Sequence, residues 1–465
     1  MTQRRSPCPL CTKPLIEGAL KCPHCRSWLV EREESQAPKV ILAGVTIVGT
    51  IFAVAVGGRT SPVQEAPPLT TMTVESAKSS AATAAMDAPR PASIGPEIEP
   101  EPEPPPPADP KKLWRAREIV LGDAHPLDVV FHPKGTSVYV SADDATLREY
   151  LLKTGEMVHK ASVPAQGDDI RLIFDRYVAV LRHQDAGRIP VMDTAAWDRD
   201  PVLLDIGRSP GEIIALPDGR TVLAATTEGK RLVRFDLPTG VRLADMTLPH
   251  ATGQLFLVRA EDRPYVAAMG ALAHGGRQAG AWVDLFDPTE EPFGATRRSI
   301  FVGREPRVGA ISRKGEMLFF PDRVSNRAVQ LIVAGTTTVR STAVGASPEQ
   351  GFFMNDDRHG VTLDSKARTV SVVDLATMKI ETTLMLDGVP STGAVSVDGR
   401  TLFVSLGGTE WPPKGRGLAV ITGDPPRVVS TLDTDEGVSA VDVSRDGARA
   451  VVASYYGKSI FVIEQ

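Results

Sequence analysis

The chain has 465 residues and a net charge of −5 at pH 7, from 52 basic and 57 acidic side chains. This acidic balance argues against a general nucleic-acid-binding surface. The 40 glycines and 38 prolines favour turns, so they indicate many short elements and lean towards an all-β chain. A chain of this length also calls for more than one structural unit, and the composition changes twice before residue 113.

The four cysteines all lie near the N-terminus, as Cys8-x2-Cys11 and Cys22-x2-Cys25. Two Cys-x2-Cys turns can hold one Zn²⁺ ion with four thiolates in the tetrahedral geometry that zinc takes in structural sites. We therefore predict a zinc ribbon over residues 1–38 with one structural zinc ion, ligated by all four cysteines. So small a segment has almost no core, and metal binding would supply its folding energy.

The second cysteine pair also matches a thiol oxidoreductase motif, but that chemistry needs a βαβ context that so short a segment cannot supply. Haem attachment would need a histidine where Arg26 stands. Both pairs read Cys-Pro-x-Cys, and the segment resembles the short zinc ribbons at the N-termini of many bacterial membrane proteins. Trp28 is its single aromatic residue, so it lacks the stacking side chains of a single-strand binder, and we expect no nucleic-acid partner.

The next segment is apolar and carries no charge over residues 40–58, which read VILAGVTIVGTIFAVAVGG. As a helix rising about 1.5 Å per residue, these residues would span roughly 28 Å, close to the thickness of a hydrocarbon core. We predict a single transmembrane helix over residues 39–59. A cleaved signal peptide is the alternative, since Ala53 to Ala55 resemble a cleavage site, but a separate module precedes the run.

The flanking charges give this helix an orientation. Seven basic residues precede it, whereas only Arg59, Lys78 and Arg90 follow it before residue 111. Basic residues stay on the cytoplasmic side, so we predict a cytoplasmic N-terminus, an inner-membrane anchor and an exported, periplasmic C-terminal part. The absence of cysteine after Cys25 agrees with export without disulfides. A small-residue stripe within the helix, Gly49, Ala53 and Gly57, offers a contact through which two copies could form a homodimer.

Residues 60–112 are rich in Pro, Ala, Ser, Thr and Glu, and they end in PEIEPEPEPPPPADP. Such a segment has too little apolar surface to offset its ordering entropy, so we predict a disordered linker. Its Glu-Pro run favours an extended polyproline II conformation. The linker is expected to be a spacer, with a recognised Pro-rich ligand as the alternative.

The remaining residues, 113–465, contain a repeat of short apolar strands separated by polar turns. The turn and the strand after it recur as HPKGTSVYVSA, LPDGRTVLAAT, SRKGEMLFFPD, SVDGRTLFVSL and SRDGARAVVAS. First strands start near residues 126, 169, 211, 252, 307, 349, 391 and 438. A period of about forty residues with four strands is that of a propeller blade.

We predict eight blades, with seven as the alternative because the second and fourth copies are degenerate. The last copy ends after three strands, and the segment over residues 113–122 supplies a spare strand that would complete it. The stretches DGRTLFVS, SKARTVSVVDLAT and SYYGKSIFVIE resemble the strand-turn-strand unit of YVTN/YncE-like β-propellers, a WD40-like group. This resemblance implies the fold, and it implies little about function because propellers have many functions.

The propeller region lacks two catalytic signatures. It contains no H-E-x-x-H or phosphate-loop pattern, and its histidines are scattered, as expected of turn or surface residues. We therefore predict no catalytic residue, and a binding role is favoured over an enzymatic one.

Ligand binding is expected where loops lead into the inner strands, at one mouth of the central channel. The charged residues that we place there as candidates are Asp128, Asp168, Asp169, Glu212, Arg304 and Arg307. Acids predominate among these loops, so a cation or a cationic ligand is conceivable, and a solvated rim is the alternative. Two insertions, residues 271–280 and 407–417, are further candidates because long loops on a rigid scaffold often carry function. The second insertion contains Trp411 beside two prolines.

Three functions follow from these elements. The favoured one is a membrane-anchored envelope protein whose propeller acts as an interaction, scaffold or ligand-binding module towards an unidentified protein. One alternative is a propeller hydrolase of the lactonase kind that uses a cation at the channel mouth. The other is a transmembrane signalling or assembly component whose ribbon recruits a cytoplasmic partner.

Overall fold

The computed structural model describes residues 114–465, apart from residues 165, 182–186, 208, 227–229, 251, 261–262 and 271–279. The predicted zinc ribbon, transmembrane helix and linker lie outside these residues, as do Cys8, Cys11, Cys22 and Cys25. Within the described residues, no helix has the length and hydrophobicity that a membrane crossing requires.

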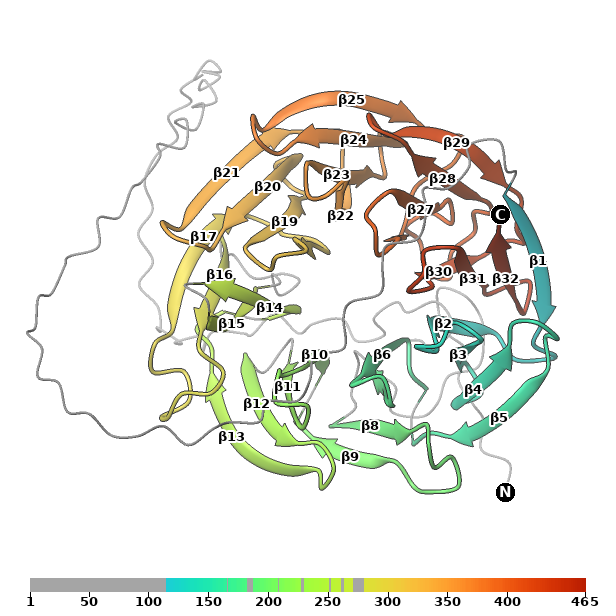
Figure 1. Cartoon of the computed structure of the whole chain (residues 1–465), viewed down its shortest axis with the longest axis horizontal. Coiled ribbons are helices and arrows are strands. Elements are labelled where there is room, and N and C mark those ends of the chain that lie inside the picture. The colour runs from blue at the N-terminus through green and yellow to red at the C-terminus, as the bar shows by residue number, and fades with distance from the viewer. Residues whose placement is uncertain are drawn as a thin grey trace, which may run out of the picture. The chain divides into compact units, whose positions relative to one another are not determined.

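The described residues form eight four-stranded antiparallel sheets arranged as the blades of a ring (Figure 1). In each blade the strand nearest the channel comes first. Blade 1 consists of β2 (Pro126–Phe131), β3 (Ser137–Ala142), β4 (Thr146–Leu151) and β5 (Met157–Ser162), and blade 2 of β6 (Asp169–Ile173), β7 (Tyr177–Leu181), β8 (Arg188–Asp193) and β9 (Val202–Asp205). Blade 3 consists of β10 (Pro210–Ala215), β11 (Thr221–Thr226), β12 (Arg231–Asp236) and β13 (Val241–Thr247), and blade 4 of β14 (Gln254–Ala260), β15 (Arg263–Met269), β16 (Ala281–Phe286) and β17 (Arg298–Gly303).

Blades 5 to 8 follow the same plan. Blade 5 consists of β18 (Ala310–Ile311), β19 (Met317–Asp322), β20 (Arg327–Ile332) and β21 (Thr338–Ala343), and blade 6 of β22 (Pro348–Met354), β23 (His359–Asp364), β24 (Thr369–Asp374) and β25 (Lys379–Met385). Blade 7 consists of β26 (Gly393–Val395), β27 (Thr401–Ser405), β28 (Leu418–Thr422) and β29 (Arg427–Leu432), and blade 8 of β30 (Val438–Val443), β31 (Arg449–Ser454), β32 (Ser459–Glu464) and β1 (Arg115–Val120). The all-β prediction with eight blades is confirmed for this part of the chain, and the seven-blade alternative is wrong.

The core lies between the blades. The second strands β3 and β11 are buried along their whole length, because both faces of each sheet pack against neighbouring blades. The outer strand β13, by contrast, has only exposed and half-buried residues. One apolar cluster, for example, joins Val138 of blade 1 to Val451 and Ile460 of blade 8. The strength of the ring therefore depends on contacts between blades.

Both ends of the chain contribute to blade 8, as the spare strand predicted. Strand β1 pairs antiparallel with β32, in a register that runs from Arg115 opposite Glu464 to Val120 opposite Ser459. In Figure 1, β1 in teal lies beside the last strands in red. This pairing closes the ring and covers the edge that β32 would otherwise leave open.

The repeated Asp-Gly turns make the tight connections between first and second strands. In blade 3, Asp218 accepts hydrogen bonds at its Oδ1 from the amides of Arg220 and Thr221, at 2.9 and 2.7 Å. Gly219 follows with φ of +68°, a conformation that side chains disfavour. The motif recognised in the sequence is thus a turn motif on the ring face opposite to the predicted site.

Two kinds of connection meet on the other face of the ring, which we call the loop face. One leads from the outer strand of a blade into the next blade, and the other joins second and third strands. They are hydrogen-bonded to each other: the amide of Ser365 donates to the carbonyl of Ser347 at 3.0 Å, and that of Tyr455 to Gly437 at 2.8 Å. The insertion over residues 407–417 is a connection of the second kind and lies on this face.

Candidate functional site

A cavity of about 500 Å³ occupies the channel mouth on the loop face. We call it the mouth cavity. It brings together five of the seven predicted ligand-binding residues, which are Asp128, Asp168, Asp169, Arg307 and Trp411. They come from blades 1, 2, 5 and 7 or from the loops leading into them, so only the closed ring assembles this set.

Arg171 is the centre of an ion-pair cluster on the blade 2 side of the mouth cavity. It pairs with Asp169, and its Nε lies 2.9 Å from Oε1 of Glu212 in the next blade. Burial lowers the pKa of Arg171, but Asp169 and Glu212 outweigh this and raise it overall. Burial also raises the pKa of Asp128, with Asp169 adding to the effect, and it raises the pKa of Glu212. We call these four residues the Arg171 cluster.

The predicted residues Asp128, Asp169 and Glu212 lie within the first strands of their blades, and the prediction that placed them in loops is wrong. Asp128 and Glu212 each follow an irregularity in strand pairing, after Pro126 and Pro210. Such an irregularity redirects the side chains near it, and this explains how charged residues of an inner strand reach the channel.

Polar side chains of the inner strands also fasten neighbouring blades together. Oδ2 of Asp128 accepts the amide of Ile170 at 2.8 Å, and Oδ2 of Asp442 accepts the amide of Phe131 at 2.7 Å. The same link recurs from Gln350, whose Oε1 accepts the amide of Gly393 at 3.1 Å. Asp128, predicted as a ligand-binding residue, therefore also holds blades 1 and 2 together.

The two predicted arginines of one loop differ in position. Arg304 is exposed and lines neither cavity of the loop face, while its backbone amide donates to Oδ2 of Asp322 at 2.9 Å. Arg307 lies at the mouth, where its Nε donates to Oε2 of Glu349 at 2.9 Å. Of the two, only Arg307 is placed to contact a ligand in the cavity.

Trp411 belongs to an aromatic group beside the mouth cavity. Its ring lies 5.7 Å from that of Tyr455 in an edge-on arrangement, and Tyr455 stacks on His125 at 4.7 Å. Tyr456 extends the group at 5.3 Å from Tyr455 and is 45% exposed. The two tyrosines were not predicted as site residues, although they are adjacent aromatic residues in a turn and could have been selected on that ground.

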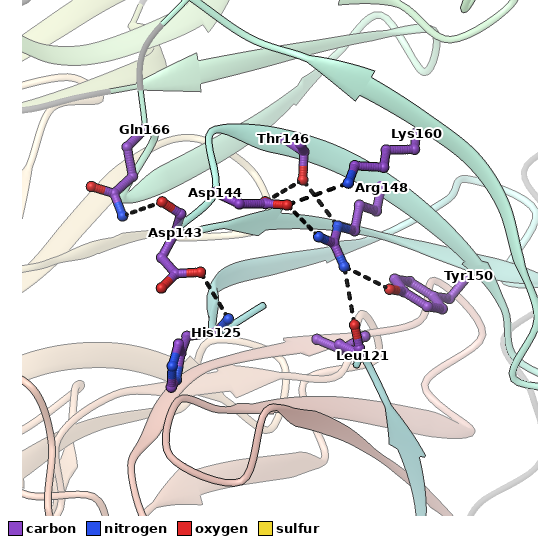
Figure 2. A network of polar contacts seen from close by, with 9 residues as sticks. All are labelled: Leu121, His125, Asp143, Asp144, Thr146, Arg148, Tyr150, Lys160 and Gln166. Carbon is purple, nitrogen blue, oxygen red and sulfur yellow. Dashed lines mark hydrogen bonds and ion pairs between the residues drawn. The ribbon is translucent and has the colours of Figure 1, made fainter. Parts of the chain in front are cut away.

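The loops around His125 are held in place by a polar network (Figure 2). Oδ1 of Asp143 accepts the amide of His125 at 2.9 Å, and Gln166 donates to the carbonyl of Asp143 at 2.8 Å. Beside them, Arg148 pairs with Asp144 at 2.5 Å and donates to the carbonyl of Leu121, just after β1, at 3.1 Å. These hydrogen bonds therefore fix the loops that carry the aromatic group before any ligand binds.

A second cavity of about 730 Å³ adjoins the mouth cavity between blades 5 and 6, and we call it the blade 5–6 cavity. It is lined by three basic residues and two acidic ones, together with small polar groups. The charged lining residues are Arg307, Arg323, Lys366, Glu305 and Glu349. Arg307, Glu349 and Thr409 line both cavities, so the two form one continuous depression.

His359 departs from the expectation that histidines are turn or surface residues, because it is fully buried at the start of β23. Its Nε2 lies 2.6 Å from Oε2 of Glu381, and its Nδ1 lies 3.2 Å from Nδ2 of Asn355. The same Asn355 nitrogen donates to the carbonyl of Gly423 in blade 7 at 3.0 Å. These contacts join blades 6 and 7 away from both cavities.

In the described part of the chain, no group of three or more His, Cys, Asp or Glu side chains is arranged to hold a metal ion. The carboxylates of Asp169 and Glu212 are engaged by Arg171. The acidic loops suggested a bound cation at the channel mouth, but the described residues provide no set of ligands for a metal ion. The insertion over residues 271–280 falls almost entirely outside the described residues.

Comparison with known proteins identifies the fold and no family. No family model matches the sequence, and no curated protein is similar enough in sequence to count as a relative. The structure is similar to the C-terminal WD40 domain of Sif2, at 12% identity and a TM-score of 0.58, covering 75% of this chain and 98% of that chain. It is also similar to hydrazine synthase of Kuenenia stuttgartiensis, at 15% identity and a TM-score of 0.49, covering 74% of this chain and 97% of that chain.

The likeness to the WD40 domain shows a β-propeller with a WD40-like neighbour, even though the sequence contains no Gly-His pair and only one Trp-Asp pair, Trp197-Asp198. The fold is shared so widely, with 1787 matching chains, that it does not indicate an activity. The function must be argued from the loop face.

Proposed function

We propose that this chain is a membrane-anchored envelope protein whose propeller binds a protein partner through the loop face. The observation that carries the proposal is the position of the insertion over residues 407–417. Its Thr409 lines both cavities, and its Trp411 lies against the aromatic group at the mouth. A long loop that brings an aromatic residue to a rigid, polar depression has the composition of a protein-binding surface.

The residues before the propeller extend this proposal. The zinc ribbon over residues 1–38 would remain in the cytoplasm, the helix over residues 39–59 would anchor the chain in the inner membrane, and residues 60–112 would space the propeller from the bilayer. The charge asymmetry around residues 40–58 and the two cysteine pairs support this arrangement.

A photo-crosslinking amino acid placed at Thr409 in the full-length chain tests the partner-binding role in cells. We expect a discrete crosslinked species that becomes several-fold weaker when Trp411→Ala is added, because the aromatic side chain would lose its contact area. The same crosslinker at Met385, which is 73% exposed on the outer strand β25, is the control and should give no such species. Equal crosslinking from both positions, or no effect of Trp411→Ala, would contradict the proposal.

The zinc ribbon is tested by metal analysis of the purified full-length chain. We expect one zinc ion per chain, bound by four thiolates. Cys22→Ser should release the metal, because three thiolates hold zinc less tightly, whereas His24→Ala should retain it. A disulfide between Cys22 and Cys25 in cells, or zinc loss on His24→Ala, would show that the ribbon interpretation is wrong.

A further inference from the structure

The depression formed by the mouth cavity and the blade 5–6 cavity has different charges at its two ends, and we call the whole depression the groove. The blade 5–6 cavity is lined by three cations and two carboxylates. The mouth cavity is lined by five carboxylates, including Asp128, and by Arg171 and Arg307. A ligand that crosses the groove therefore meets an excess of positive charge only at the blade 5–6 end.

The carboxylates of the blade 5–6 cavity are already engaged. Glu349 is 7% exposed, pairs with Arg307, and accepts at its Oε1 from the hydroxyl of Ser347 at 3.1 Å. Arg323 pairs with Glu305 and approaches Glu349 at 3.8 Å. These contacts hold two guanidinium groups against the cavity wall at fixed positions.

Two cationic groups of the same cavity retain donors for a ligand. Arg307 uses its Nε on Glu349, and its two terminal amino groups donate to no other residue in the described ranges. The side chain of Arg307 is 37% exposed. The ammonium of Lys366, an exposed residue that lines the same cavity, forms no ion pair with the part of the chain that the structure describes. A guanidinium with its terminal nitrogens free can bind a carboxylate with two parallel hydrogen bonds.

We propose that the blade 5–6 cavity is a subsite for the carboxylate of an extended polypeptide, whose following residues cross Thr409 towards Trp411. This inference rests on the proposed partner-binding function and adds the chemical class of the segment that is bound. A polypeptide fits because the groove continues from the cations to the aromatic group over several blades. The carboxylate excess at the mouth disfavours a second anionic group there, so the ligand is acidic at one end only.

Fluorescence anisotropy on the full-length chain tests the subsite with three labelled eight-residue peptides. All three share the same uncharged body, which contains a tryptophan. The first peptide has Glu at one end, the second has Gln at that end, and the third has Glu at both ends. We expect the peptide with one Glu to bind about tenfold or more tightly than the Gln peptide, as a charge-assisted hydrogen bond predicts. The peptide with two Glu residues should bind no better than the peptide with one.

Lys366→Gln and Arg307→Gln should each remove most of the Glu preference and make binding less sensitive to salt. Arg304→Gln is the matched control, because Arg304 is exposed on the same loop as Arg307 and lines neither cavity. Lys366→Gln removes no ion pair of the described residues, so a loss of binding in that variant reports the subsite even if Arg307→Gln perturbs the fold.

Three outcomes would overturn the inference. The first is equal binding of the Glu and Gln peptides. The second is that the Arg304→Gln control loses as much of the Glu preference as Lys366→Gln does. The third is that inorganic phosphate binds with the same dependence on Lys366 while no peptide binds. The last result would indicate a site for free anions. If peptides fail while the crosslink from Thr409 persists, the inference is wrong and the proposed function stands.

Discussion

Ile119→Ala is expected to lower the free energy of unfolding by about 2–5 kcal/mol, the usual cost of deleting a buried aliphatic side chain. Ile119 lies on β1 and is 4% exposed, within the apolar cluster that joins blades 8 and 1. Because β1 completes blade 8 from the other end of the chain, the cavity left by alanine weakens the seam of the ring. Urea unfolding followed by tryptophan fluorescence measures the loss.

Val120→Ala is the matched control for this prediction. Val120 is the next residue of the same strand, pairs with Ser459 and is 65% exposed. Its truncation removes a similar number of atoms from the same β-strand, but without a buried cavity, and should cost less than about 1 kcal/mol. If the two substitutions cost the same, β1 does not pack in the closed ring as described.

Arg171→Met is expected to destabilise the propeller by about 2–3 kcal/mol at pH 8. Removing one member of a buried charge cluster leaves the others unpaired, which costs about 3–5 kcal/mol where water is excluded. The smaller figure allows for solvent screening, since the side chain of Arg171 is 39% exposed in the channel. Arg304→Met, an exposed arginine outside the cavities, should change stability little.

The cost of Arg171→Met should increase with pH. The pKa of Asp128 and that of Glu212 are already raised in the folded chain by burial. A carboxyl group whose pKa is raised on folding supports the fold at low pH and loses that contribution as the pH rises through its folded pKa. Without the guanidinium these pKa values rise further, so unfolding at pH 5 should show a smaller loss than at pH 8.

A second substitution separates charge from packing in this cluster. Adding Glu212→Gln to Arg171→Met removes one of the unpaired carboxylates and should restore part of the lost stability at pH 8. A loss that is equal at pH 5 and pH 8, and that Glu212→Gln does not reduce, would show that Arg171 contributes through packing alone.

Most of the propeller was predictable from the sequence because its blades repeat. First strands were predicted near residues 126, 169, 211, 252, 307, 349, 391 and 438, and they begin at 126, 169, 210, 254, 310, 348, 393 and 438. The largest difference is at blade 5, where Pro306 forms an isolated bridge with Asp322 before the two-residue strand β18. The Asp-Gly turns and alternating strands are local signals, and local signals are readable without the fold.

The site was predictable only in part, because its members meet through ring closure. Asp168 and Asp169 were selected from a loop that leads towards an inner strand, and Trp411 was selected from a long insertion. All three line one cavity. Arg171 was missed because it lies inside a strand, two residues after Asp169, where a charged residue looks like part of a solvated face. The spacing of two along a strand places both side chains on one face, and that signal could have identified the pair.

The seam of the ring has a mechanical consequence. Residues before Trp114 join the propeller through β1, and the first pair of that strand, Arg115 with Glu464, is where the chain enters the ladder. Tension carried by the preceding residues would therefore act on this pair first and peel β1 from β32 one pair at a time. The other seven blades draw their strands from uninterrupted stretches of chain, so they would bear this load only after the seam had parted. Under such a load, a ring of this design would yield at one strand before any other.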